Sequence, residues 1–125
     1  MRKTILVVED SPTQMQSVKL ALQAKGYHVI TAATGEEGLE KARQEMPELV
    51  VLDVILPGKN GFQVCRDLKT SPETKQMPVI LLTSKDQESD RFWGIRQGAD
   101  EYLTKPCNES DLLASVARQL NHWHG

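Results

Sequence analysis

The sequence predicts an α/β fold in which a parallel sheet is covered by helices on both faces. Apolar runs such as Ile5-Leu6-Val7-Val8 and Leu49-Val50-Val51-Leu52 alternate with segments of helical periodicity. A strand that is apolar at every position is buried on both faces, which is typical of parallel sheets. Successive strand–helix units fill 125 residues, a length that fits a single domain over residues 1–125 without an output domain.

The strands are expected at residues 4–9, 28–32, 49–53, 78–82 and 101–104. The first connecting helix begins near Pro12, because proline is favoured in the first turn of a helix, and it ends at Gly26. The second helix ends before Pro47, which cannot continue a helix. Apolar side chains of these two helices that should face the core are Met15, Val18, Ala21, Leu22, Leu39, Ala42 and Met46.

The third helix begins near Gly61, and the fifth covers about 109–121. Their apolar side chains at helical spacing are Phe62, Cys65, Leu68, Leu112, Leu113, Val116, Ala117 and Leu120. The fourth helix covers about 87–97, ends at Gly98 and contains Gly94 near its middle. Because glycine inside a helix costs about 1 kcal/mol relative to alanine, we expect this helix to be the weakest and to move.

The composition argues against several classes of function. The formal net charge is −2, and acidic and basic residues are interleaved, so the chain lacks the charge pattern of nucleic-acid-binding proteins. No apolar stretch approaches the roughly 20 residues that span a bilayer, and we expect a cytoplasmic protein without membrane contact. Cys65 and Cys107 are expected to be unpaired thiols in a reducing compartment.

Side chains that can bind metal or phosphate lie at the ends of the predicted strands. Glu9 and Asp10 follow the first strand, Asp53 ends the third, Thr83 follows the fourth, and Lys105 follows the fifth. The carboxyl ends of parallel strands meet at one edge of the sheet, where α/β folds place their ligand sites. We therefore expect the three acids to meet in one cleft with the threonine and the lysine.

Three carboxylates packed together repel one another, and a divalent cation is the natural compensation. Mg²⁺ is commonly held by one or two carboxylates with water and phosphate oxygens, so Asp10 and Asp53 are candidate ligands, with Mn²⁺ as an alternative ion. Glu9 would act directly or through a bound water. Phosphoryl transfer recurrently uses a metal, a lysine and a hydroxyl donor, and Lys105 and Thr83 supply the last two. Asp53 is then the candidate nucleophile, forming an acyl phosphate.

Over all 125 residues, the chain resembles the response-regulator receiver domains of two-component signalling. The segments that carry this resemblance are Val8-Glu9-Asp10-Ser11, Leu52-Asp53-Val54-Ile55-Leu56-Pro57-Gly58 with Asn60-Gly61, Leu82-Thr83-Ser84, and Gly98-Ala99-Asp100-Glu101-Tyr102-Leu103-Thr104-Lys105-Pro106. Gaps of 43, 30 and 22 residues separate Asp10, Asp53, Thr83 and Lys105, and this joint order is far more specific than any one segment. The resemblance implies a doubly wound (βα)5 flavodoxin-like three-layer sandwich, a five-stranded parallel sheet with strand order 2-1-3-4-5.

The resemblance also implies a role for each residue at the sheet edge. The phosphoryl acceptor falls on Asp53, the acid pair on Glu9 and Asp10, a metal-contacting backbone carbonyl on Ile55, and the phosphate-binding lysine on Lys105. The donor would be a histidine kinase or a phosphotransfer domain. The domain would be no enzyme in the usual sense, although it would catalyse its own phosphorylation and dephosphorylation.

Further positions of the family concern the transmission of the signal. The switch hydroxyl falls on Thr83, the switch aromatic on Tyr102, and a usually cis proline on Pro106. An unidentified output protein would dock on the fourth helix, fifth strand and fifth helix, with Trp93, Arg96 and Tyr102 on that surface. Core packing is the alternative for Trp93, and an ordinary strand aromatic is the alternative for Tyr102. We expect a monomer, with weak dimerisation on phosphorylation as the alternative.

Within the family, the chain looks like the stand-alone chemotaxis-type regulators. The stretch from Lys85 through Trp93-Gly94 to Ala99 resembles regulators of type IV pilus twitching motility. Ile55 and Lys85 occupy positions where the family varies and where the dephosphorylation rate is set, so the lifetime of the phosphorylated state stays open. His122 and His124 resemble a small metal-binding pair, but a frayed terminal turn is the favoured interpretation.

Two other functions compete with a phosphorylation-controlled switch. A phosphohydrolase of the aspartyl-phosphate type needs a second acid two residues after the nucleophile, and that position here is Ile55. A phosphate sink would drain phosphoryl groups from a shared kinase without any output through its surface. The sequence does not exclude the sink.

Overall fold

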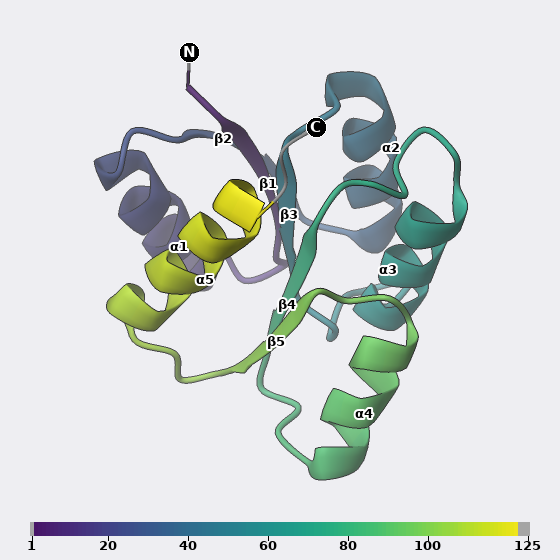
Figure 1. The fold of residues 1–125 in the computed structure, drawn as a ribbon. Helices are drawn as coiled ribbons and strands as arrows, with labels where there is room; N and C mark the ends of the chain where they lie inside the picture. The colour runs from purple at the N-terminus through teal and green to yellow at the C-terminus, as the bar shows by residue number, and fades with distance from the viewer. Residues whose placement is uncertain (1, 123–125) are drawn as a thin grey trace.

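The computed structural model describes residues 2–122, in which five strands and five helices alternate along the chain (Figure 1). The strands are β1 (Thr4–Val8), β2 (His28–Ala32), β3 (Leu49–Leu52), β4 (Val79–Thr83) and β5 (Glu101–Thr104). The helices are α1 (Pro12–Ala24), α2 (Gly35–Glu45), α3 (Gly61–Thr70), α4 (Glu88–Arg96) and α5 (Glu109–His122). All strand pairs are parallel in the order β2-β1-β3-β4-β5, which confirms the expected topology.

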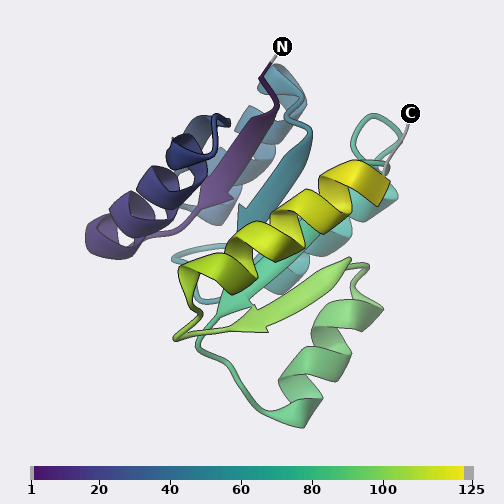
Figure 2. The ribbon, with the colours of Figure 1, turned by 60° about the vertical axis from the view of Figure 1, so that its left-hand side comes forward.

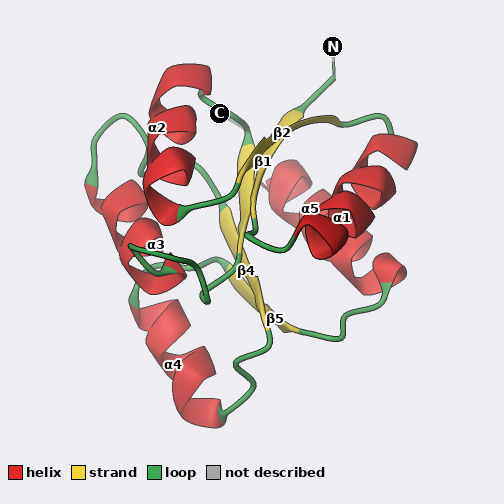
Figure 3. Ribbon diagram, turned by 180° about the vertical axis from the view of Figure 1, so that it is seen from behind, coloured by secondary structure: helices red, strands yellow, loops and turns green. Residues whose placement is uncertain are grey.

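The sheet lies between two layers of helices, as expected for a three-layer sandwich. Helices α2, α3 and α4 cover one face, and α1 and α5 cover the other (Figure 3). Figure 2 shows α1 and α5, in purple and yellow, on the same side of the sheet. Among residues 2–122, no helix has the length and apolar character needed to cross a bilayer.

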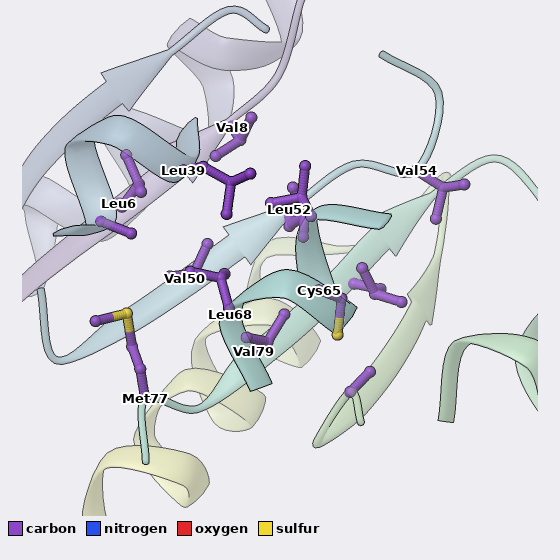
Figure 4. Close-up of a cluster of buried hydrophobic side chains, with 14 of the residues drawn as sticks. Leu6, Val8, Leu39, Val50, Leu52, Val54, Cys65, Leu68, Met77 and Val79 are labelled. Carbon is purple, nitrogen blue, oxygen red and sulfur yellow. The ribbon is translucent and has the colours of Figure 1, made fainter. Parts of the chain in front are cut away.

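Alternate side chains of the central strands fill the cores on the two faces of the sheet. On β1, Leu6 and Val8 join the cluster packed by α2 and α3, which Figure 4 shows, whereas Ile5 and Val7 join the cluster packed by α1 and α5. All four side chains are at most 1% exposed. Full burial of a branched aliphatic side chain stabilises a fold by about 1.5–3 kcal/mol. The buried central strands therefore fix the position of the carboxyl edge of the sheet.

Strand ends differ slightly from the prediction, in a way that matters for the site, whereas α1 begins at Pro12 as predicted. β1 ends at Val8 and β3 ends at Leu52, so Glu9 and Asp53 lie just beyond the regular ladder, while Thr83 is the last residue of β4. The first turn of α1 is capped by Ser11, whose side chain accepts a hydrogen bond from the backbone N–H of Gln14 at 3.3 Å. Such a cap satisfies a backbone donor that the helix itself leaves without a partner.

The prediction that Met46 faces the core is wrong, although Leu39 and Ala42 of the same helix are buried. Met46 ends α2 with a left-handed backbone (φ 47°), and 48% of the residue is exposed. Proline disfavours helical backbone in the residue that precedes it, so Met46 leaves the helix before Pro47 and its side chain turns away from the sheet. Cys65 and Cys107 are unpaired, as predicted.

Gly94 has a packing role in addition to its low helix propensity. A Cβ atom at this position would lie 2.7 Å from Cδ2 of Tyr102 and 2.9 Å from Cδ1 of Leu81, which is too close for any side chain. The missing side chain therefore lets α4 pack directly against the aromatic ring on β5.

A polar contact joins β5 to α5. The Glu101 carboxylate accepts hydrogen bonds from Arg118 Nη2 at 2.6 Å, Gln119 Nε2 at 2.7 Å and Ser115 Oγ at 2.7 Å. The Arg118 hydrogen bonds are the largest cause that lowers the pKa of Glu101 from 4.5 to about 2, and partial burial opposes them. Because the folded pKa lies below the unfolded value, this contribution to stability is complete above pH 4.5 and is lost as the pH falls toward 2.

We expect Glu101→Gln to lower the free energy of unfolding by about 1 kcal/mol at neutral pH, because the variant loses the carboxylate that Arg118 binds and solvent screens this partly exposed ion pair. The difference from wild type should shrink as the pH falls below 4.5, because the unfolded wild-type chain then binds a proton at Glu101 that the folded protein does not bind until the pH approaches 2. Urea unfolding at a series of pH values measures this, with Glu40→Gln on the exposed surface of α2 as the control. A difference that stays constant down to about pH 3 would contradict the assignment.

Candidate functional site

The candidate site is a cleft of about 670 Å³ at the carboxyl edge of the sheet, beside α1 and the start of α5. Residues that the sequence predicted for the site and that line this cleft are Glu9, Asp10, Asp53, Ile55, Lys105 and Pro106. The Lys105–Pro106 peptide bond is cis. The structure thus brings the acids and the lysine together, although they come from three separate segments of the chain.

The backbone fixes where the acids stand. The N–H of Glu9 donates to the carbonyl oxygen of Ala32 at 3.0 Å, and the N–H of Asp53 donates to that of Val8 at 3.0 Å. These bonds continue the parallel ladders one residue beyond the strands. Carboxylate oxygens of Glu9, Asp10 and Asp53 lie within 4.8 Å of one another. Glu9 and Asp53 are each 6% exposed, whereas Asp10 is exposed.

Lys105 carries the positive charge that faces the acids. Its Nζ lies 2.5 Å from Oε1 of Glu9 and 2.9 Å from Oδ2 of Asp53, and it also donates to Oε1 of Gln14. Burial raises the pKa of Glu9, and the hydrogen bond from Lys105 opposes this rise without cancelling it. Burial acts to lower the pKa of Lys105, but the hydrogen bonds to Glu9 and Asp53 outweigh it and leave the pKa above its ordinary value.

Both oxygens of the Asp53 carboxylate are held. Oδ1 accepts a hydrogen bond from the backbone N–H of Ile55 at 3.1 Å, and Oδ2 accepts the bond from Lys105. Gly61 begins α3 directly against this segment, since a Cβ there would lie 2.1 Å from the carbonyl oxygen of Asp53. The carboxylate is therefore presented in one orientation toward the cleft.

The donor set fits a hard divalent cation. Three carboxylates carry three negative charges against the single positive charge of Lys105, and carboxylate oxygens are the ligands that Mg²⁺ prefers. The site therefore has both the oxygen atoms and the surplus negative charge that such an ion requires.

Thr83 and Tyr102 are placed differently from the residues of the cleft. Within the described residues 2–122, the cleft lining does not include Thr83, which is fully buried, and its Oγ1 accepts a hydrogen bond from the N–H of Lys85 at 3.3 Å. The Tyr102 hydroxyl donates to the carbonyl oxygen of Lys85 at 2.7 Å. The backbone of Lys85 therefore contacts both residues: its N–H binds Thr83 and its carbonyl oxygen binds Tyr102.

Tyr102 is 4% exposed, which corrects the expectation that its side chain forms part of an accessible partner surface. The ring already occupies the interior, because Gly94 leaves room for it beside α4. Arg91 covers it, with its guanidinium carbon 5.3 Å from the ring centroid and Nη1 2.8 Å from the Tyr102 carbonyl oxygen. Burial raises the pKa of the Tyr102 hydroxyl to about 12.

Apolar side chains gather on the outer face of α4, away from the cleft. Phe92 is 62% exposed, Trp93 51% and Ile95 49%. Arg96 is exposed as well, with its guanidinium carbon 5.7 Å from the centroid of the Phe92 ring. Trp93 is therefore not a core residue. His124 and Trp123 lie outside the described residues, as does the side chain of His122.

Sequence reasoning gave no role to six polar residues that line the cleft: Ser11, Gln14, Ser17, Ser84, Cys107 and Glu109. A signal for Gln14 exists, since it lies in the first turn of a helix that begins two residues after Asp10. Side chains in a helix lean toward its N-terminus, and here that direction leads back to the acids.

The family model for the response regulator receiver domain matches residues 5–117. Among curated relatives, the chain is 48% identical over 112 residues to Protein PilH of Pseudomonas aeruginosa, covering 90% of this chain and 93% of the relative. It is 43% identical over 116 residues to the alkaline phosphatase synthesis transcriptional regulatory protein PhoP of Bacillus subtilis. That match covers 93% of this chain but 48% of PhoP, so the chain spans about half the length of that relative.

Solved structures of the family superpose closely on this one. The receiver domain protein (CheY-like) from Methanospirillum hungatei matches with a TM-score of 0.91 and 31% identity, covering 98% of this chain and 96% of the other. The chemotaxis response regulator CheY4 of Vibrio cholerae matches with a TM-score of 0.89 and 32% identity, covering 95% and 99%. The chain belongs to the response regulator receiver domain family.

Proposed function

We propose that this protein is a stand-alone response regulator that accepts a phosphoryl group on Asp53 and passes the signal to a partner. The observation that carries the proposal is the setting of the Asp53 carboxylate. It is buried yet borders the cleft, it lies 2.9 Å from the Lys105 ammonium, and it is within 4.8 Å of the carboxylates of Glu9 and Asp10. This combination suits a nucleophile that receives a negatively charged group.

The donor would be phosphohistidine of a kinase or of a phosphotransfer domain. A carboxylate oxygen of Asp53 attacks the phosphorus, the P–N bond breaks, and its electron pair leaves with the imidazole nitrogen. Lys105 already lies at the carboxylate, so its ammonium can donate to a phosphoryl oxygen as charge develops there. Because the side chain is tied to Glu9 as well, it is held in position before the donor arrives.

Glu9, Asp10 and Asp53, with the backbone carbonyl of Ile55, would hold Mg²⁺, with Mn²⁺ as the alternative ion. When bound, such a cation neutralises negative charge on the phosphoryl oxygens. Asp10 supplies an exposed ligand, whereas Glu9 divides its two oxygens between Lys105 and the backbone N–H of Ser11 at 3.0 Å. This division favours a role for Glu9 through bound water.

Thr83, Lys85 and Tyr102 would couple the phosphoryl group to the surface. If the Thr83 hydroxyl moves toward a phosphoryl oxygen, it either loses its hydrogen bond with the N–H of Lys85 or pulls the Lys85 backbone along with it. The carbonyl oxygen of Lys85 holds the Tyr102 hydroxyl, so the same movement disturbs the buried ring and the helix packed on it. Such coupled shifts bias a protein between two arrangements of existing elements.

The output surface would be formed by α4, β5 and α5, where the exposed Phe92, Trp93 and Ile95 offer apolar contacts to a partner. The 48% identity with Protein PilH, over 93% of its length, supports a stand-alone regulator. Together with the resemblance of the α4 segment to twitching-motility regulators, it favours a place in chemotaxis-like, pilus-based motility. The protein would act as a monomer in the cytoplasm, dimerising weakly at most when phosphorylated.

Asp53→Asn should abolish the formation of acyl phosphate, because the amide lacks the nucleophilic carboxylate oxygen. The protein is incubated with Mg²⁺ and acetyl phosphate, and hydroxylamine-labile phosphate is measured by intact mass. Asp86→Asn, which changes an exposed acid outside the cleft, should be phosphorylated like wild type. Labile phosphate on the Asp53→Asn protein would show that another residue is the acceptor.

Asp10→Asn should reduce metal-dependent phosphorylation by at least about tenfold while the protein stays folded. Removing one charge from a group of three carboxylates relieves repulsion, so the thermal midpoint without metal should be unchanged or higher. Thermal melts and acetyl phosphate assays test the two parts separately. An Asp10→Asn protein that keeps the full Mg²⁺-dependent rate would refute the metal role of Asp10.

Phosphorylation should change the fluorescence of Trp93, because this side chain lies on the helix that packs against Tyr102. With Trp123→Phe the signal should persist, and with Trp93→Phe most of it should be lost. Thr83→Ala should weaken the response by removing the acceptor of the Lys85 N–H. If phosphorylated Thr83→Ala protein gives the full signal, the proposed coupling is wrong, and a phosphate sink becomes the better account.

A further inference from the structure

The loop between β3 and α3 carries Ile55, which borders the cleft and holds the Asp53 carboxylate. The N–H of Ile55 donates to Oδ1 of Asp53 at 3.1 Å. At the end of the loop, the N–H of Gly61 donates to the carbonyl oxygen of Val54 at 2.9 Å. The tip of the loop, residues 57–60, is exposed or half-buried, so burial in the core does not fix its position.

The first turn of α2 holds the tip of this loop. The Glu36 carboxylate accepts the backbone N–H of Lys59 on both oxygens, at 3.3 and 3.5 Å. It also lies against Gly58, where a Cβ atom would be 2.8 Å from Oε1 of Glu36. A Cβ atom on Gly35 would be 2.1 Å from the carbonyl oxygen of Lys59, so the backbone of α2 lies directly against the loop.

Glu37, the next residue of α2, holds the loop on the other side of the site. Its Oε1 accepts the backbone N–H of Ala33 at 2.8 Å, and the carbonyl oxygen of the neighbouring Ala32 accepts the N–H of Glu9 at 3.0 Å. The first turn of α2 therefore contacts the loops that follow both β2 and β3. Within the described part of the chain, Glu36 does not line the cleft, so any effect it has on the site is transmitted by the loop.

Resting on the function proposed above, we propose that Glu36 is a positioning residue for the metal site. By binding the N–H of Lys59, its carboxylate keeps the loop against α2 and keeps Ile55 in place at the cleft. Gly35 serves the same contact, because a side chain there would push the Lys59 carbonyl away from the helix. Groups that do not touch a metal but orient its ligands commonly set the affinity of the site.

Isothermal titration of the protein with MgCl₂ measures this effect without phosphorylation. Glu36→Ala removes the acceptor of the Lys59 N–H and should raise the dissociation constant for Mg²⁺ about three- to tenfold, the effect of one lost hydrogen bond. Glu36→Gln keeps an acceptor oxygen at the same reach and should restore most of the affinity. Glu40→Ala removes an exposed carboxylate from the same helix, so it controls for the loss of charge and should bind Mg²⁺ like wild type.

Gly35→Ala separates positioning of the loop from stabilisation of α2. Alanine is a better helix former than glycine, so a role in helix stability alone predicts that this variant binds Mg²⁺ like wild type. Positioning predicts weaker binding, because the added Cβ atom displaces the Lys59 carbonyl.

Wild-type affinity in Glu36→Ala or in Gly35→Ala, or a Glu36→Gln protein as weak as Glu36→Ala, would overturn the role of Glu36 and leave the proposed function standing. Failure of the wild-type protein to bind Mg²⁺ would refute the metal site of the proposed function, and the role of Glu36 with it.

Discussion

Repulsion among three carboxylates at one edge of the sheet is the constraint on which the rest of the site depends. The parallel ladders impose it, because backbone hydrogen bonds to Ala32 and Val8 fix where Glu9 and Asp53 stand. Two like charges about 4 Å apart repel by about 4 kcal/mol at an effective dielectric constant of 20. The Lys105 ammonium offsets this repulsion, and it comes from the segment after β5. The acids of the first half of the chain are therefore compensated only when the last strand is in place.

Lys105 also links the acid cluster to Thr83 and, through Lys85, to Tyr102. Its backbone N–H donates to the carbonyl oxygen of Thr83 at 2.8 Å, while the side chain of Thr83 binds the N–H of Lys85. Lys85 continues the connection to Tyr102 through its carbonyl oxygen. Buried groups packed at crystal-like density do not deform smoothly, so a displacement at one end has to be met by a discrete rearrangement at the other.

Patterns within single segments allowed most of the fold to be predicted. Continuous apolar runs indicated the strands, Pro12 and Pro47 indicated helix limits, and acids at strand ends indicated one cleft. Contacts between segments were harder to predict, because hydrophobic periodicity describes one helix or strand at a time. The Tyr102 ring can point inward because Gly94 has no side chain. From the sequence, Gly94 indicated only that α4 is a weak helix. Gln14 was missed because its side-chain contact in the cleft is with Lys105, a residue 91 positions away.

Attachment of α4 to the sheet depends on Tyr102. Within α4 the buried residue is Gly94, whereas Phe92, Trp93 and Ile95 are about half exposed or more. Burial of apolar side chains, which holds the other helices, therefore contributes little here. The helix is held instead by close packing on the Tyr102 ring and by the bond from Arg91 to the Tyr102 carbonyl. Both contacts converge on one residue of β5, so the position of the exposed apolar face follows the position of that residue.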